Sequence, residues 1–365
     1  MHLEEIFNRT LKSLPNANWL SSNNGHNIAF MAGVSKCLNY LGEQNNVVVF
    51  NQLNKMPLIK LGDDYYSPYG KISDDFFTDY GMNKISHDAF ISYDHEKLKN
   101  IATWMRMDKE EYEKEVINVQ GEFLSSLSNH IKTADSMTFP VNSLYGRLYY
   151  LDKSGFDISR MLFHETKKSN ERSIVDNGLA LGLGDAANSD YQMPEGIFVK
   201  PDDKPIHIYS EESVQMPFFA RKGQVLDIDQ RKNIEKVVGK VSNEWLTIAN
   251  EREHADLAYS KLTGDITNEL IDVLQNAPER KDEVKATFDN AMVDWRKELD
   301  RINPLAKKAM TKSLKEQGFD YMRVRNDKGS WGREADTMVV LDPSSLVCAS
   351  LPARDFDNSF EQEMS

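Results

Sequence analysis

The sequence predicts an α+β protein with two domains, each of which combines helices with short strands. The chain has 365 residues, which is more than one ordinary hydrophobic core serves, and 40% of them are hydrophobic. Apolar residues recur at helical spacing near both ends, and short apolar runs bounded by Gly and Pro lie between them. Scattered Pro, Gly and Ser in 138–156 mark a boundary, so we expect domains at 1–155 and 156–352, followed by an acidic tail at 353–365.

The N-terminal domain is predicted to be the smaller α+β unit. A helix is expected over Leu3–Leu14, before Pro15, and a second over Ile28–Leu41, which ends at Gly42. Strands are expected at Val47–Phe50 and Leu58–Leu61. The charged stretch His95–Lys132 has a period of 3.6 residues, which predicts helix with a solvated face.

The C-terminal domain is predicted to consist of short strands interrupted by a helical insertion. A short helix over Ser169–Asn177 closes at Gly178. The insertion covers about 230–317, with breaks expected near Gly264 and Pro304. Strands are expected at Met161–Phe163, Gly196–Val199, Ile206–Tyr209, Met216–Ala220, Gln224–Ile228, Tyr321–Val324 and Met338–Leu341.

Charge and cysteine content argue against several classes of protein. Lys and Arg number 44 against 57 Asp and Glu, a net charge of −13, which gives no general attraction to nucleic acid. The two cysteines, Cys37 and Cys348, form neither a disulfide framework nor a CxxC or Cys/His cluster, so no metal site is expected. With no signal-peptide pattern and no apolar run of about 20 residues, we expect a cytoplasmic protein without a membrane partner.

Four segments of the second half occur in a recognisable order. The first is Leu162-Phe163-His164-Glu165-Thr166, and the second is the helix that ends at Gly178. The third is Gly196-Ile197-Phe198-Val199, with Tyr209 shortly after, and the last runs from Gly318-Phe319-Asp320-Tyr321 through Glu334 and Asp336 to Val339-Val340-Leu341-Asp342-Pro343. This series resembles the ADP-ribosyltransferase superfamily, closest to the poly(ADP-ribose)-polymerase-like branch with a His–Tyr–acid triad found in bacterial toxins and phage proteins. The resemblance covers about half the chain and implies a split β-sandwich.

The resemblance implies that the chain binds NAD+ as a substrate and transfers its ADP-ribose to a protein target, without a metal. It implies a phage or bacterial effector, acting in the bacterial cytoplasm or injected into a host cell. His164 would bond a hydroxyl of the adenosine ribose, Thr166 would support that strand, and the backbone of Glu165 would hold the nicotinamide amide. Phe198 and Tyr209 would stack on the nicotinamide, whose positive charge suits aromatic faces.

Three positions depart from the family pattern. Glu165 replaces a glycine, so its side chain has to turn away from the nicotinamide, and Phe198 replaces a tyrosine. The catalytic glutamate of the family falls on Thr337, and because side chains alternate along a strand, a shift of one residue changes the face. We favour Asp336 as the catalytic carboxylate, with Glu334 as its partner or substitute. NAD+ hydrolysis in the same site, or an inactive transferase-like adaptor that only binds a partner, are the alternatives.

The N-terminal domain shows a fainter pattern. Gly25-His26-Asn27 opens a predicted helix, and Met56-Pro57 begins a stretch that ends in Tyr65-Tyr66-Ser67-Pro68-Tyr69-Gly70. This looks like a papain-like hydrolase in which Asn27 replaces the cysteine and Met56-Pro57 the histidine. Since that chemistry needs a thiolate beside a histidine, the resemblance implies a dead protease fold used for binding the target. An unrelated α+β domain is the alternative.

Overall fold

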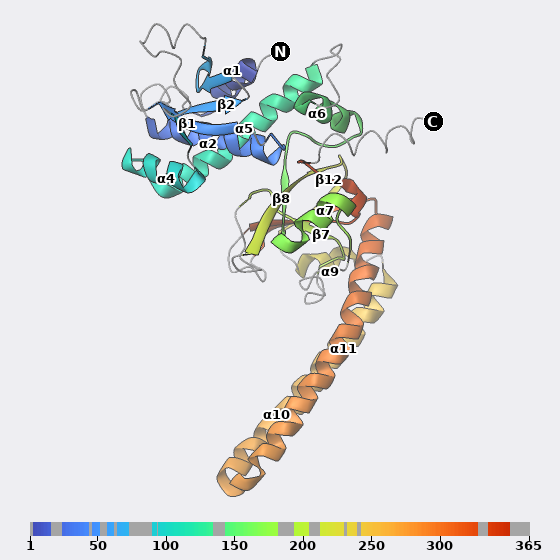
Figure 1. Cartoon of the computed structure of the whole chain (residues 1–365). Coiled ribbons are helices and arrows are strands. Elements are labelled where there is room, and N and C mark those ends of the chain that lie inside the picture. The colour runs from blue at the N-terminus through green and yellow to red at the C-terminus, as the bar shows by residue number, and fades with distance from the viewer. Residues whose placement is uncertain are drawn as a thin grey trace.

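The chain forms a mixed body of helices and sheets, from which one long helical hairpin projects (Figure 1). The computed structural model describes residues 3–15, 24–43, 46–51, 57–61, 64–72, 90–92, 94–133, 143–181, 193–203, 212–229, 232–238, 242–327 and 335–350. The predicted general class, α+β, is confirmed.

The N-terminal half places helices around one antiparallel sheet with the strand order β4-β3-β2-β1-β5. The strands are β1 (Asn46–Asn51), β2 (Pro57–Leu61), β3 (Asp64–Ser67), β4 (Gly70–Lys71) and β5 (Phe90–Ser92). The helices are α1 (Leu3–Ser13), α2 (Asn24–Tyr40), α4 (His95–Trp104), α5 (Lys109–Thr133) and α6 (Leu144–Lys153).

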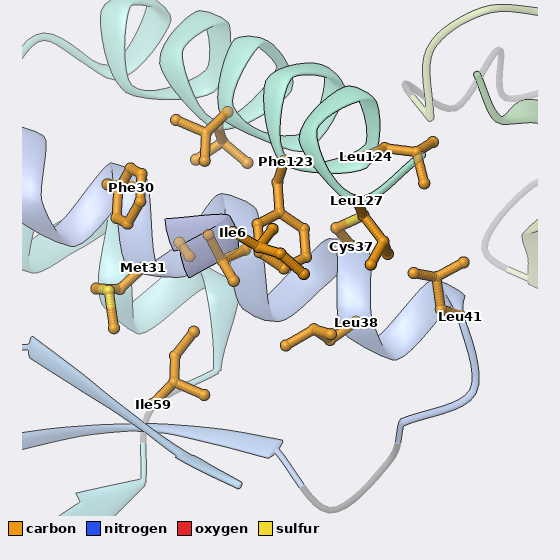
Figure 2. Close-up of a cluster of buried hydrophobic side chains, with 14 of the residues drawn as sticks. Ile6, Phe30, Met31, Cys37, Leu38, Leu41, Ile59, Phe123, Leu124 and Leu127 are labelled. Atoms are coloured by element: carbon orange, nitrogen blue, oxygen red, sulfur yellow. The ribbon is translucent and has the colours of Figure 1, made fainter. Parts of the chain in front are cut away.

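Helix α2 is the centre of this half. Its side chains pack on α5 through Phe123 and Leu127 and on the sheet through Ile59, as Figure 2 shows. Burying one such Leu, Ile or Phe stabilises the fold by about 1.5–3 kcal/mol relative to exposure. Gly33 sits where the two helices cross, because a Cβ there would lie 2.7 Å from the Cβ of Val119. The helix is therefore apolar on nearly every side, as a helix enclosed by neighbours requires.

The hydrophobic core does not stop at the predicted boundary after residue 155. The cluster around α2 continues into the second half through Phe163, Phe219 and Ala349, all at most 5% exposed. The two halves therefore pack on one another through a common cluster, while the domain boundaries at 1–155 and 156–352 stay a prediction. The Pro, Gly and Ser residues at 138–156 predict a boundary, but part of this stretch forms the helix α6.

The second half contains two small sheets. A mixed sheet has the order β7-β11-β10-β9, in which β9 and β10 are parallel, and an antiparallel sheet has the order β12-β8-β6. One bridge between Phe163 and Lys200 joins β6 to β7, and so joins the two sheets. The strands are β6 (Leu162–Lys167), β7 (Ile197–Val199), β8 (Ser213–Ala220), β9 (Val225–Ile228), β10 (Tyr321–Asp327), β11 (Ala335–Val340) and β12 (Leu346–Cys348). The predicted strand Ile206–Tyr209 lies outside the described residues.

The joined sheets have two differently covered faces. On one face, Met216 and Phe218 of β8 pack against Ile174 and Val175 of the short helix α7 (Glu171–Asn177). On the other face, the N-terminal half covers β6 and β8, and the helices of the insertion cover β10 and β11. Because alternate residues point to opposite faces, the strand register decides which side chains can meet.

The helical insertion consists of α9 (Lys232–Val238), α10 (Asn243–Asn276) and α11 (Lys281–Glu316). Helices α10 and α11 run side by side and extend away from the sheets (Figure 1). The predicted breaks at Gly264 and Pro304 are wrong: both residues lie inside helices, and the chain turns at Ala277–Arg280 instead. Packing between the helices outweighs the weak local preference at Gly264, and buried residues on both sides of Pro304 hold α11 together. No helix in the described ranges is both long and apolar enough to cross a bilayer.

Candidate functional site

His164 lies in the middle of β6 on the face covered by α7, in the row of Met216 on β8. Its Nδ1 lies 2.9 Å from the carbonyl oxygen of Phe198 on β7. A carbonyl only accepts, so Nδ1 carries the proton and donates it, which leaves Nε2 of the neutral ring as an acceptor. Burial, more than any other cause, lowers the pKa of His164, so the ring is neutral at pH 7. His164 can therefore accept a hydrogen bond from a hydroxyl group.

Glu165 points to the opposite face of the sheet. There its carboxylate lies 3.5 Å from the ammonium of Lys200, and both side chains are at most 4% exposed. The register explains the pair. Lys200 is directly opposite Phe163, and Glu165 is the next residue of β6 on the same face, so Lys200 and Glu165 are diagonal neighbours. The charge of Glu165 is thus held on the face opposite His164. Lys200 was not among the predicted site residues, although a lysine that ends an apolar strand and precedes a proline is a recognisable signal.

Thr166 is buried near the end of β6, on the face of His164. Its hydroxyl accepts a hydrogen bond of 3.4 Å from the side-chain amide of Asn170, which leads into α7. Gly178, with a φ of 74°, then ends α7, a backbone conformation that glycine adopts without strain. These contacts fix the corner at which α7 folds back over the face that carries His164.

Phe198 is not on the face of His164. It pairs directly with Val339 of β11, and its ring packs with the cluster under the insertion helices, including Met322 and Val324. The ring was expected to stack on a nicotinamide beside His164, but the strand register puts the ring on the opposite face. The backbone carbonyl of Phe198 contacts His164 instead. The strand can approach β11 closely because Gly196 precedes it, where a Cβ would lie 2.5 Å from Cγ1 of Val339.

Asp336 and Thr337 point to opposite faces of β11. Thr337 pairs with Val324 and shares the face of Val339, under the insertion helices. Asp336 shares the face of Met338, and Met338 is opposite Val199, which in turn lies in the row of His164. Alternation along β11 therefore puts Asp336, and not Thr337, on the face of His164.

Asp336 forms an ion pair with Arg323 of β10. Next to it, Arg325 binds Asp227 of β9 through hydrogen bonds of 2.9 and 3.0 Å, which hold the pKa of Asp227 below its ordinary value. Burial, followed by repulsion from Arg323, lowers the pKa of Arg160, which precedes β6. The Nε of Arg323 is buried and makes no hydrogen bond within the described part of the chain. Three guanidinium groups thus gather at this end of the face with the carboxylates of Asp336 and Asp227, and the charges of Asp157 and Asp229 also act on Arg160 and Arg325.

His164 and Asp336 lie two strands and two residues apart. With strands about 4.8 Å apart and a rise of about 3.3 Å per residue, their Cα atoms are separated by roughly 12 Å if the sheet is flat. The side chains point to the same side of the sheets but do not touch, and the buried side chains of Val199 and Met338 lie in the rows between them. Tyr209 and Glu334, the other two predicted site residues, lie outside the described residues.

The N-terminal half has a helix followed by an antiparallel sheet, and Asn27 lies in the first turn of α2. Asn27 is 7% exposed, and its Oδ1 is buried without a hydrogen bond from any described residue. Cys37 is fully buried three turns further on, and burial raises the pKa of its thiol. A neutral, enclosed thiol is a poor nucleophile. Met56 lies outside the described residues.

Comparisons with protein-family models, with curated proteins and with solved structures found no match for this chain.

Proposed function

We propose that this chain is an NAD+-dependent mono-ADP-ribosyltransferase that modifies a protein target. The observation that supports it most is that His164 and Asp336, two of the residues singled out by the family resemblance, project from one face of the joined sheets. They come from strands more than 170 positions apart in the sequence.

In the proposed reaction, the bond between the ribose C1′ and the nicotinamide nitrogen breaks, and its electron pair leaves with neutral nicotinamide. The ribosyl carbon gains positive charge, and a nucleophile of the target attacks it and loses a proton to solvent. A carboxylate near that carbon stabilises the developing charge, and we assign this role to Asp336. The neutral His164 accepts a hydrogen bond from a hydroxyl of the adenosine ribose through Nε2 and so orients NAD+ on this face.

The arginines at the same end of the face are candidate partners for the diphosphate of NAD+. That group carries two negative charges, and Arg323 and Arg325 are now held by Asp336 and Asp227. Guanidinium groups bind phosphate oxygens in a bidentate manner. In this proposal, the ion pair between Asp336 and Arg323 must open when NAD+ binds. Arg323 would then bind the diphosphate, and Asp336 would face the ribose.

One observation favours an inactive, binding-only module instead. Asp336 is already neutralised by Arg323, and the ring of Phe198 lies on the other face. Such a module would keep the fold and bind a partner without turnover.

The test is incubation of the purified chain with NAD+ labelled on the adenylate and a bacterial lysate. Transfer gives a labelled protein band, hydrolysis gives free labelled ADP-ribose without a band, and a binding module gives neither. Asp336→Asn should reduce turnover at least about a hundredfold, the range expected for loss of a group that stabilises transition-state charge. The matched control is Asp289→Asn, an exposed aspartate on α11 far from the sheets. Equal turnover by both variants would remove Asp336 from the mechanism, and Glu334→Gln would then be the next variant to test.

A further inference from the structure

A buried carboxylate connects the N-terminal half to the strand that orients His164. Asp203, four residues after the end of β7, has a side chain that is 3% exposed and forms an ion pair with Lys36 of α2. The hydroxyl of Tyr40, one turn further along α2, donates a hydrogen bond of 2.7 Å to the same oxygen. Two side chains of one helix thus hold one carboxylate of the other half.

The charge of this carboxylate is compensated. Burial alone would raise the pKa of Asp203, but the charge of Lys36, with hydrogen bonds from Lys36 and Tyr40, holds that pKa below its ordinary value. A buried carboxylate that stays ionised has strict geometric needs, because its partners must remain in place. The contact therefore constrains position, whereas a purely apolar contact allows sliding.

The same helix also touches β6. The ring of Tyr40 meets the ring of Phe163 edge-on, with centroids 5.0 Å apart. Phe163 is the residue whose backbone pairs with Lys200 through hydrogen bonds of 2.8 and 3.0 Å, which is the bridge between the two sheets. Tyr40 thus contacts β6 with its ring and the chain beyond β7 with its hydroxyl.

Just before these anchors along the chain lies Phe198, whose carbonyl oxygen accepts the hydrogen bond from Nδ1 of His164. Strand β7 has three residues, and its C-terminal end is held by the Phe163 bridge, by the Glu165–Lys200 pair and by Asp203. A shift of that end would move the carbonyl and release the imidazole from its orientation.

We propose that Asp203 is a positioning residue: fixed by Lys36 and Tyr40, it locks β7 in register with β6 and thereby sets the orientation of His164. The N-terminal half is then an integral part of the candidate site and not a detachable targeting module. For its effect on catalysis the proposal rests on the proposed function, but its structural content does not.

The experiment compares Tyr40→Phe and Asp203→Asn with the unmodified full chain. Tyr40→Phe keeps the ring contact with Phe163 and removes only the hydrogen bond, while Asp203→Asn keeps the volume and removes the charge. Matched controls are Tyr150→Phe on α6 and Asp289→Asn on α11, both at surface-exposed positions. Amide hydrogen exchange at Phe163 and Lys200 and the NMR titration of the His164 ring are measured in each.

We expect exchange at the two bridge amides to become about tenfold faster, as for loss of one buried hydrogen bond, while the core amides of α5 around Phe123 keep their protection. The pKa of His164 should rise towards its ordinary value as water reaches the ring. Unchanged exchange and titration would overturn the proposal, and so would an equal loss of protection in α5, because that would show general destabilisation.

Activity separates this proposal from the proposed function. If the unmodified chain consumes NAD+, the two variants should raise the KM for NAD+ more than they lower kcat. If it consumes none, the proposed function fails, yet exchange and titration still decide whether Asp203 positions β7.

Discussion

The buried ion pair between Glu165 and Lys200 gives the sharpest test of how this fold accommodates a charge between its two sheets. Lys200→Met removes one charge and keeps a flexible side chain of similar length. The carboxylate of Glu165 then stays in a place that is 3% exposed, without the ammonium that now lies 3.5 Å away. Breaking a buried pair on one side typically costs about 3–5 kcal/mol, because the remaining charge has lost its water without compensation.

That loss would be about a fifth or more of the total stability of an ordinary protein, which is about 5–15 kcal/mol. The double variant Glu165→Met, Lys200→Met removes both charges. Its free energy of unfolding should lie within about 1 kcal/mol of that of the unmodified chain, since apolar side chains of similar volume often replace such pairs without loss. The free energy of unfolding is measured by urea titration with circular dichroism, over all four members of the cycle.

The pair Lys312–Glu244 serves as the exposed control, with side chains 61% and 56% exposed. Lys312→Met should change stability little, because solvent screens such pairs. The reasoning is refuted if Lys200→Met costs less than about 1 kcal/mol, or if the double variant is as unstable as the sum of the two single variants.

Three further predictions follow from other contacts. Because burial lowers the pKa of His164 in the folded chain, the unfolded chain takes up the proton first, near pH 6.5. Burial of the neutral ring therefore costs no stability above that pH, and the protein loses stability as the pH drops towards the folded pKa. The urea midpoint, measured at pH 7.5, 6.5 and 5.5, should decline less steeply in His164→Gln than in the unmodified chain, and equal slopes would contradict this. Gly196→Ala should lower stability by about 1–3 kcal/mol, because the new Cβ would lie 2.6 Å from the Val340 carbonyl oxygen; a thermal midpoint equal to that of the parent chain would show that β7 can move. Replacing 262–291 by a short Gly linker removes the separate apolar cluster at the end of the hairpin, so NAD+ consumption should persist while labelling of the protein target is lost; retained labelling would place target recognition elsewhere.

Local patterns along the chain were enough to predict most elements of the fold. The period of apolar residues predicted α2 and α5, short apolar runs predicted β1, β2 and β11, and a terminal glycine predicted the end of α7. The segments α10 and α11 were predicted to be helical, but the prediction placed breaks inside them. The low helix propensity of Gly264 and Pro304 is a local property, whereas the packing that overrides it comes from the neighbouring helix.

The sequence by itself determined the α+β class and the alternation that places Asp336 and Thr337 on opposite faces of a strand. Only the tertiary structure decided which of those faces carries His164, since that depends on β6 and β11 meeting on either side of β7. The tertiary structure also decided that Lys200 forms an ion pair with Glu165 and that the ring of Phe198 packs under the insertion helices. It likewise decided that Lys36 of α2 forms an ion pair with Asp203. Neighbouring residues on a strand fix which side chains share a face, but the elements that cover each face come from distant parts of the chain, and no local pattern records them.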